Sequence, residues 1–210
     1  MNESKYIALL IKPLLLESQQ EQVCFNEKLK DSFLHITHRY QISFEELLGH
    51  GEYVAYMPLR NDCMDIIACL RLLMQPYQLL FAIGVCELDE DVQSYEAVRS
   101  QANVAMKKLE KQRKRLDYRN LNMKIELPKE YETLSISLNM MLLFDCDIQN
   151  GWTQKQSDIV YVTYFDGMNQ KEVAQHFKVS QPNIHQVLKK ANYSLYRDIM
   201  NTYRNIFGKL

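Results

Sequence analysis

The stretch Gly167–Lys190, GMNQKEVAQHFKVSQPNIHQVLKK, decides how the last third of this 210-residue chain folds. Asn169 is a typical N-cap residue, and Glu172 three positions later completes a capping box. Ser180 is the same kind of residue at the head of the next apolar pattern, so it is expected to cap that helix. Two capped starts separated by a short turn predict two helices that meet at an angle.

A further helix is expected just before this stretch. Thr153 is a natural N-cap, and Gln156 completes its capping box. Gly167 is placed for the left-handed conformation in which many helices end. The positions expected to be buried across the three helices are Ile159, Val160, Val162 (or Thr163), Phe165, Val173, Ala174, Phe177, Val179, Ile184, Val187, Leu188 and Ala191. Their helical spacing predicts one shared apolar face.

Burial of that face leaves a polar face directed outward. The residues expected to contact DNA are Lys155, Lys178, Ser180, Gln181, Pro182, Asn183, His185, Gln186, Lys189 and Lys190. Asn and Gln amides suit bidentate contacts with adenine, whereas lysines, a Ser hydroxyl and helix N-termini suit phosphates. The pattern predicts a helix-turn-helix whose last helix, beginning near Ser180, reads the major groove of double-stranded DNA. The alternative is a three-helix bundle that packs against the rest of the chain and touches no DNA.

These residues also resemble a known family pattern. The sequence Glu172-Val-Ala-x-x-Phe-x-Val-Ser-x-x-x-Ile-x-x-x-Leu is similar to the region-4 helix-turn-helix of bacterial sigma factors and to that of response-regulator output domains. The resemblance covers residues 152 to about 192. It implies DNA binding by the last of the three helices, and it does not imply any particular operator.

The charge distribution favours a division of the chain at Gln149-Asn150-Gly151. Residues 1–150 carry 17 basic and 22 acidic side chains (17 − 22 = −5), whereas residues 151–210 carry 8 and 4 (8 − 4 = +4). Attraction for phosphate is therefore concentrated in the C-terminal part. We expect two domains, residues 1–150 and residues 151–210.

Residues 1–150 alternate between strand and helix patterns. Strands are expected at 5–11, 42–48, 52–57, 78–87 and 121–127, and helices at 21–40, 62–74, 94–118 and 130–146. Asn61 or Asp62 is expected to cap the second of these helices. The order predicts an α+β protein: a mixed sheet covered by helices, with residues 42–57 as a hairpin, followed by the all-α helix-turn-helix domain.

The composition predicts a cytoplasmic protein outside the membrane. The five cysteines are odd in number and no two have C-x-x-C spacing, which indicates reduced thiols rather than disulfides or a zinc site. No segment supplies the roughly 20 consecutive apolar residues needed to span a bilayer. The N-terminus lacks the basic and apolar regions of a signal peptide.

Residues 1–150 also resemble the SatD family. The features that carry this resemblance are the strand beginning Tyr6-Ile-Ala, the Gly51-Glu52-aromatic hairpin, the strand Phe81–Glu87, and a basic helix with Ala97, Ala102 and Ala105. The resemblance implies a nucleotide-cyclase-like palm domain, often followed by a helix-turn-helix. It would cover the whole chain.

The carboxylates of a palm-type active site are mostly missing. Such cyclases and polymerases hold Mg²⁺ with an Asp at the end of the first strand and an acid in a Gly-Asp-Glu-Phe hairpin. Here the first strand ends at Lys12, and Gly51 stands where the Asp would be, so only Glu52 remains. We therefore expect no enzyme activity, no metal and no cofactor. A nucleotide effector, with Lys12 supplying positive charge, is an alternative use of the pocket.

The final segment has its own apolar pattern, at Tyr193, Tyr196, Ile199, Met200, Tyr203 and Phe207. We expect the helix to continue beyond Ala191, and either to pack against its own domain or to form a homodimer that matches two half-sites. The predicted function is a transcriptional regulator, in which the N-terminal domain serves dimerisation or sensing. The alternatives are a nucleotide-binding protein with a degenerate cyclase-like fold, or an adaptor that binds another protein.

Overall fold

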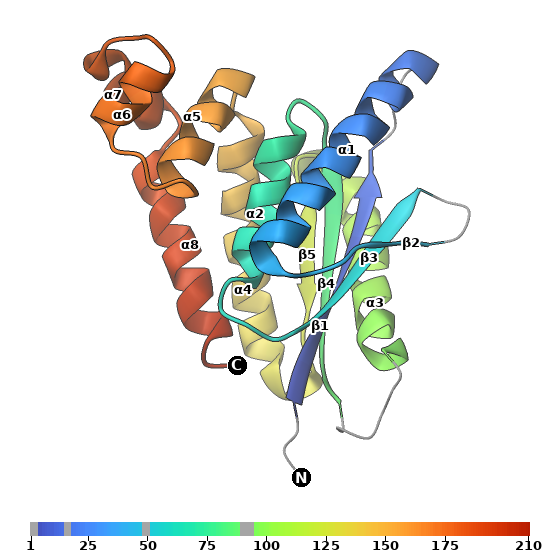
Figure 1. The fold of residues 1–210 in the computed structure, drawn as a ribbon. Helices are drawn as coiled ribbons and strands as arrows, with labels where there is room; N and C mark the ends of the chain where they lie inside the picture. The colour runs from blue at the N-terminus through green and yellow to red at the C-terminus, as the bar shows by residue number, and fades with distance from the viewer. Residues whose placement is uncertain (1–3, 15–17, 48–50, 89–94) are drawn as a thin grey trace.

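The computed structural model describes residues 4–14, 18–47, 51–88 and 95–210, and it contains one mixed five-stranded sheet (Figure 1). The strands are β1 (Ser4–Pro13), β2 (Glu45–Leu47), β3 (Glu52–Pro58), β4 (Leu79–Leu88) and β5 (Met123–Glu126). Their order across the sheet is β2-β3-β1-β4-β5. Only the β4–β5 pair is parallel. The predicted α+β class with a mixed sheet is confirmed.

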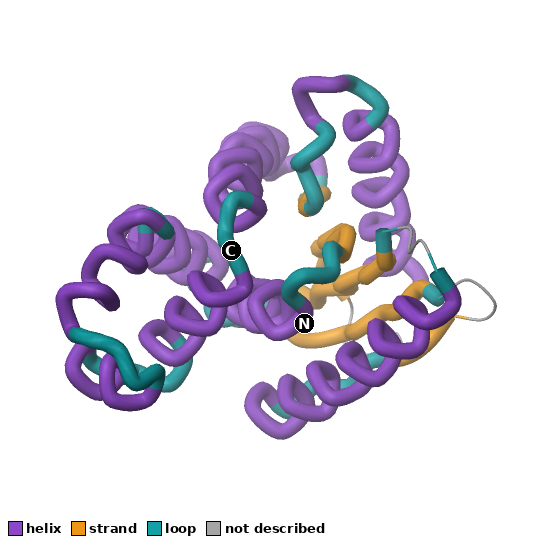
Figure 2. Tube along the Cα trace, turned by 90° about the horizontal axis from the view of Figure 1, so that it is seen from above, coloured by secondary structure: helices purple, strands orange, loops and turns teal. Residues whose placement is uncertain are grey.

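Helices cover both faces of the sheet (Figures 1 and 2). The helices of this layer are α1 (Gln19–Tyr40), α2 (Cys63–Met74), α3 (Glu96–Arg113) and α4 (Glu132–Asn150), with short 3₁₀ turns η1 (Leu116–Tyr118) and η2 (Lys129–Tyr131). The views place α1 and α2 on one face and α3 on the other, whereas α4 lies beside the free edge of β5, where its Asp145 pairs with Arg71 of α2. Because both faces are covered, the central strand β1 is buried continuously from Ile7 to Ile11.

The packing of α3 on the sheet depends on a glycine. A Cβ at Gly84 in β4 would lie 2.2 Å from the backbone nitrogen of Ala102 and 2.6 Å from the carbonyl oxygen of Val98. The α3 backbone therefore rests directly on β4, and the small Ala102 and Ala105 of α3 are fully buried against the sheet. This close approach explains why a strand that is otherwise rich in large apolar residues contains a glycine.

The chain continues into four more helices: α5 (Gln154–Tyr164), α6 (Gln170–His176), α7 (Gln181–Lys190) and α8 (Tyr193–Phe207). The expectation that α7 continues past Ala191 is wrong. Asn192 adopts a left-handed conformation with φ 51°, and the chain changes direction there before α8 begins. Asn tolerates this conformation better than most residues, so the break has a local cause.

The apolar stripe of α8 is buried within the chain. Tyr196, Met200 and Tyr203 are completely buried and Phe207 is 3 % exposed. The helix packs against α2 and α4 of the sheet layer as well as against α7. Of the two expected uses of this stripe, packing within the chain is the one observed, and the surface it covers includes α2 and α4 as well as Trp152 and Tyr164.

An ion pair and two hydrogen bonds secure α8 and α5 to the sheet layer. The carboxylate of Asp65 in α2 is 2 % exposed and accepts two bonds from the Arg204 guanidinium, at 2.7 and 2.9 Å. Tyr164 at the end of α5 donates a third bond to Asp65, at 2.9 Å. Helix α1 also contacts α5, since His35 Nε2 lies 2.7 Å from the Tyr161 hydroxyl. A buried carboxylate is thus fully compensated at this junction.

Two expected helix ends are wrong, and one expected cap is right in position only. The helix expected to reach Tyr118 ends at Arg113, where the Arg113 guanidinium donates to the carbonyl of Leu121 and the chain turns back. The helix expected at 130–146 extends to Asn150. Asp62 occupies the N-cap position of α2, yet its side chain makes no capping bond because it pairs with Arg60 instead. The start expected at Ser94 and strand residue Leu48 lie outside the described residues.

Within the ranges that the structure describes, every helix is too short or too polar to cross a membrane.

Candidate functional site

The ten residues predicted to contact DNA all have exposed side chains. They lie on α5, in the turn between α6 and α7, and along α7, which together form the three-helix unit α5–α7 (Gln154–Lys190) at one end of the molecule (Figure 1). The seven members between Gln181 and Lys190 share the outer surface of α7, whose inner surface is formed by Ile184 and Leu188. The structure therefore brings most of the predicted set onto one helix.

The start of each of the first two helices is fixed by the capping box that the sequence predicts. Thr153 accepts from the Gln156 backbone at 3.3 Å, and Gln156 accepts in return from the Thr153 backbone at 2.9 Å. The Asn169 side chain accepts from the backbone N–H groups of Lys171 and Glu172. The Glu172 carboxylate accepts in return from the Asn169 backbone at 2.7 Å. Each box satisfies backbone donors that the helix itself leaves free.

The turn between α6 and α7 is a Schellman motif with an unusual residue. The Val179 backbone donates to the carbonyl of Ala174 at 3.0 Å, and the Lys178 backbone donates to that of Gln175 at 3.2 Å. Lys178 occupies the left-handed position, with φ 54°, that usually belongs to glycine. Gly167, by contrast, has φ 69°, in the left-handed region as predicted. Nothing in the sequence indicated the left-handed conformation of Lys178.

The expected role of Ser180 is only partly correct. Ser180 is the N-cap residue of α7 by position, but its hydroxyl makes no capping hydrogen bond. Its backbone carbonyl accepts from Asn183 at 3.0 Å and from Ile184 at 3.3 Å, as in any helix start. The hydroxyl is exposed and remains available to a partner.

The interior of the unit holds α7 against α5. Val173, Ile159 and Ile184 are fully buried, and Leu188 is 5 % exposed. The indole N–H of Trp152 donates to the carbonyl of Ala191 at 2.9 Å, which connects the segment before α5 to the end of α7. The angle of α7 is therefore set by packing at its middle and by a buried hydrogen bond at its end.

The lysines of the predicted set carry positive charge that no described carboxylate contacts. Lys155, Lys178, Lys189 and Lys190 form no ion pair with any residue in the described ranges. The Glu172 carboxylate is engaged in its capping box. Four exposed ammonium groups, without ion pairs among the described residues, make the surface of the unit suited to an anionic partner.

A hollow beside α7 adds residues that the sequence did not single out. It has a volume of about 820 Å³ and lies between α7, the start of α8 and the turn that joins α5 to α6. His185 and Lys189 from the predicted set line it, together with Asn192, Ser194 and Arg197. Ser194 and Arg197 were missed because they come close to α7 only after the chain reverses at Asn192.

Glu52, the hairpin carboxylate that remains of a palm-type site, is held by a lysine. Lys12 Nζ lies 3.0 Å from Glu52 Oε1 and 2.8 Å from Glu110 Oε1. These hydrogen bonds, first with Glu110 and then with Glu52, raise the pKa of Lys12. Glu110 was missed because it is 98 residues away in sequence and reaches the site only through α3. Lys12 thus carries the positive charge between two carboxylates.

Comparison with known proteins places the whole chain in one family. No curated protein matches the chain in sequence. The model of the SatD family matches residues 6–206, which span the sheet layer and the helices α5 to α8 alike. On the strength of this match, the chain belongs to the SatD family.

Proposed function

We propose that the chain binds double-stranded DNA through a helix-turn-helix formed by α6 and α7, with α7 lying in the major groove. The observation that carries the proposal is the exposed surface of α7, where Gln181, Asn183 and Gln186 lie beside unpaired lysines. Asn and Gln amides can pair with base edges, while Lys189 and Lys190 can hold phosphates. The buried face beneath them keeps the helix at a fixed angle.

The charge of the unit supports a nucleic acid as the partner. Four lysines without ion pairs would each neutralise a phosphate and release its counterions. Four such contacts correspond to a slope of about −3.6 for the logarithm of the affinity against that of the salt concentration. Binding that depends steeply on salt is therefore part of the proposal.

A protein partner is less well supported by the same surface. Protein interfaces centre on large apolar or aromatic anchors. Along α7, all of whose residues are described, no large apolar side chain is exposed. The amides and lysines suit a hydrated, anionic groove better than the core of a protein interface.

We assign the sheet layer a supporting role in a transcriptional regulator, by dimerisation or by sensing. The unit α5–α7 is joined to it through α8 and through the bonds of Tyr164 and Arg204 to Asp65. A change in the sheet layer would therefore reach α7 through packed helices rather than through a flexible linker.

The test is a titration of the full chain with DNA from its own promoter region at about 50 and about 200 mM salt. The triple variant Gln181→Ala/Asn183→Ala/Lys189→Ala should lose at least tenfold in affinity at the lower salt, since it removes base and phosphate contacts together. The single variant Lys189→Ala should reduce the salt slope by about 1.

The matched control is Gln19→Ala/Asn26→Ala/Lys30→Ala, which removes the same three residue types from exposed positions on α1. This variant should bind as tightly as the unmodified chain. Absence of binding at low salt, or equal affinity of the two triple variants, would refute the proposal.

A further inference from the structure

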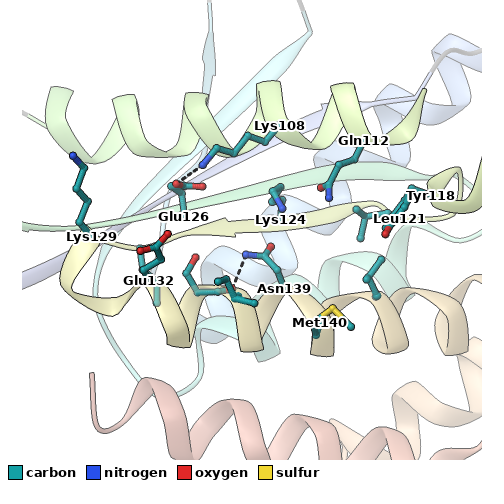
Figure 3. Close-up of a pocket in the computed structure, with 14 residues that line it drawn as sticks. Lys108, Gln112, Tyr118, Leu121, Lys124, Glu126, Lys129, Glu132, Asn139 and Met140 are labelled. Atoms are coloured by element: carbon teal, nitrogen blue, oxygen red, sulfur yellow. Dashed lines mark hydrogen bonds and ion pairs between the residues drawn. The ribbon is translucent and has the colours of Figure 1, made fainter. Parts of the chain in front are cut away.

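A groove between α3 and α4 lies on the opposite side of the sheet layer from α1 and α2, with β5 as its floor (Figure 3). Its volume is about 560 Å³, within the range of about 300–1,000 Å³ typical of small-molecule sites. Lys108 and Gln112 approach from α3, Lys124 from β5, and Asn139 and Met140 from α4. Neither the residues of α7 nor Lys12 take part in it.

Hydrogen bonds hold both walls of the groove in place. The Asn139 amide accepts from the Ile125 backbone at 3.1 Å and donates to its carbonyl at 2.9 Å, so α4 occupies the free edge of β5 as a neighbouring strand would. On the other wall, Lys108 of α3 pairs with Glu126 of β5. The groove is therefore formed before any ligand enters it, which lowers the cost of binding.

The floor of the groove carries a cation that no carboxylate of the described residues contacts directly. Lys124 is half-buried and forms no hydrogen bond or ion pair with any residue in the described segments. Burial lowers the pKa of its ammonium group, and the nearby Lys108 lowers it further, against the opposing effect of Glu126. The charged lining residues are Lys108, Lys124, Lys129, Glu126 and Glu132, a net of 3 − 2 = +1. A bound anion would offset the free energy that burial costs the charged Lys124.

A second polar group in the groove is also unsatisfied. The side-chain oxygen of Gln112 is buried and accepts no hydrogen bond in the described part of the chain. Gln112 lies on the same wall as Lys108 and faces Lys124 (Figure 3). Because the unsatisfied atom is an acceptor, it would take a hydrogen bond from a donor such as the Lys124 ammonium group, and it does not by itself favour an anion.

The α4 wall is apolar and open to solvent. Ile136 is 60 % exposed and Met140 is 52 % exposed, although both are large apolar side chains. Leu143 continues the same wall one turn further on. Exposed apolar side chains grouped beside a cation are a feature of binding sites rather than of ordinary surface.

We propose that this groove binds a small amphipathic carboxylate, with its carboxylate on Lys124 Nζ and its hydrocarbon part along Ile136, Met140 and Leu143. The carboxylate supplies Lys124 with a direct ion pair, since Glu126 is already paired with Lys108, and the hydrocarbon covers the exposed wall of α4. A second copy of the chain fits less well, because its own groove would bring the same net positive charge. This site is independent of DNA binding by α7.

The experiment is calorimetric titration of the full chain with three probes: octanoate, octan-1-ol and inorganic phosphate. Octanoate should bind at least tenfold more tightly than either of the others, because only it matches both halves of the groove. Lys124→Met should weaken octanoate at least tenfold and leave octan-1-ol unchanged. Ile136→Ser should weaken both. Lys107→Met, which removes the same charge from an exposed position of α3 outside the groove, should change nothing.

Three results would overturn the assignment. Equal affinity of the unmodified chain and Lys124→Met for octanoate would remove the role of the cation. Phosphate binding as tightly as octanoate would remove the role of the apolar wall. A third result would be that octanoate gives no heat while the chain self-associates and Ile136→Ser abolishes the self-association. The groove would then be a contact between two copies of the chain. Because the titration contains no DNA, failure of the proposed function would leave these outcomes unchanged.

Discussion

The sheet layer and the three-helix unit are stabilised in different ways. In the sheet layer, long strands and helices bury one another so closely that α3 rests on the bare backbone of Gly84. In the three-helix unit, short helices of 7 to 11 residues depend on capping boxes and a few apolar side chains. Such helices are marginal alone, so the unit depends on α8 and on Asp65 for its attachment. Changes in the sheet layer should therefore have larger effects than changes within the unit.

The largest effect is expected from Gly84→Ala. The added Cβ would meet backbone atoms of Ala102 and Val98, which cannot rotate away, so α3 must move as a whole. We expect a loss of at least about 3 kcal/mol in the free energy of unfolding, the upper part of the range for overpacked cores. Urea denaturation measures it.

The control for this change is Gly151→Ala. Its Cβ would lie 3.6 Å from the nearest atom, and its φ of −80° suits any residue. This variant should stay within about 0.5 kcal/mol of the unmodified chain. A Gly84→Ala protein as stable as the control would show that α3 does not need this close approach.

Arg204→Ala should have the next largest effect, because it leaves the Asp65 carboxylate buried without its charged partner. Breaking a buried pair costs about 3–5 kcal/mol. Since the Arg204 side chain is 41 % exposed and Tyr164 still donates to Asp65, we expect about 2 kcal/mol in thermal or urea unfolding.

Arg197→Ala on the same helix is the matched control. Arg197 lies 3.9 Å from Asp198, both side chains are more than half exposed, and such pairs contribute about 0–1 kcal/mol. If the two arginine variants lose equal stability, the pair between Arg204 and Asp65 does not hold the three-helix unit to the sheet layer.

The N-caps of α6 and α7 should differ in how much each contributes to the free energy of unfolding, and both contributions should be smaller than that of Arg204. Asn169→Ala removes two capping bonds and should cost about 1 kcal/mol, whereas Ser180→Ala removes none and should cost only a few tenths. Urea denaturation of the two variants side by side measures the difference. A larger loss for Ser180→Ala would mean that its hydroxyl caps α7 in solution.

The last prediction needs no substitution. It concerns whether the sheet layer and the three-helix unit unfold together. The single tryptophan, Trp152, reports on the three-helix unit, whereas all five cysteines lie in residues 1–150. Burial raises the pKa of the Cys63 and Cys69 thiols to about 12, so in the folded state both resist thiol reagents at pH 8. Because α8 is shared, tryptophan fluorescence and thiol labelling should give the same urea midpoint. An earlier fluorescence transition would show two independent domains.

Local chemistry made much of this structure predictable from the sequence. The capping boxes at Thr153 and Asn169, the strand at 78–87 and the hairpin near Glu52 each depend on residues a few positions apart. The exposed surface of α7 followed from its buried positions alone. In these segments local preference and final packing agree.

The rest could not be predicted because it depends on distant parts of the chain or on unusual local choices. The contact of Glu110 with Lys12 and that of Arg204 with Asp65 join residues 98 and 139 positions apart. Lys178 takes a conformation for which glycine is the usual signal. The groove between α3 and α4 exists only because η1 and η2 bring these helices to either side of β5.

The position of α8 also has a consequence for how the protein folds during synthesis. Arg204 is 139 residues beyond Asp65, so the surface of α2 that α8 covers is made long before its cover. Contacts between such distant residues slow folding, and apolar surface left open in the interval favours aggregation. Until Tyr196, Met200 and Tyr203 have been synthesised, a nascent sheet layer exposes the place where they will pack. The growing chain should therefore depend on chaperones most strongly during the synthesis of its last helix.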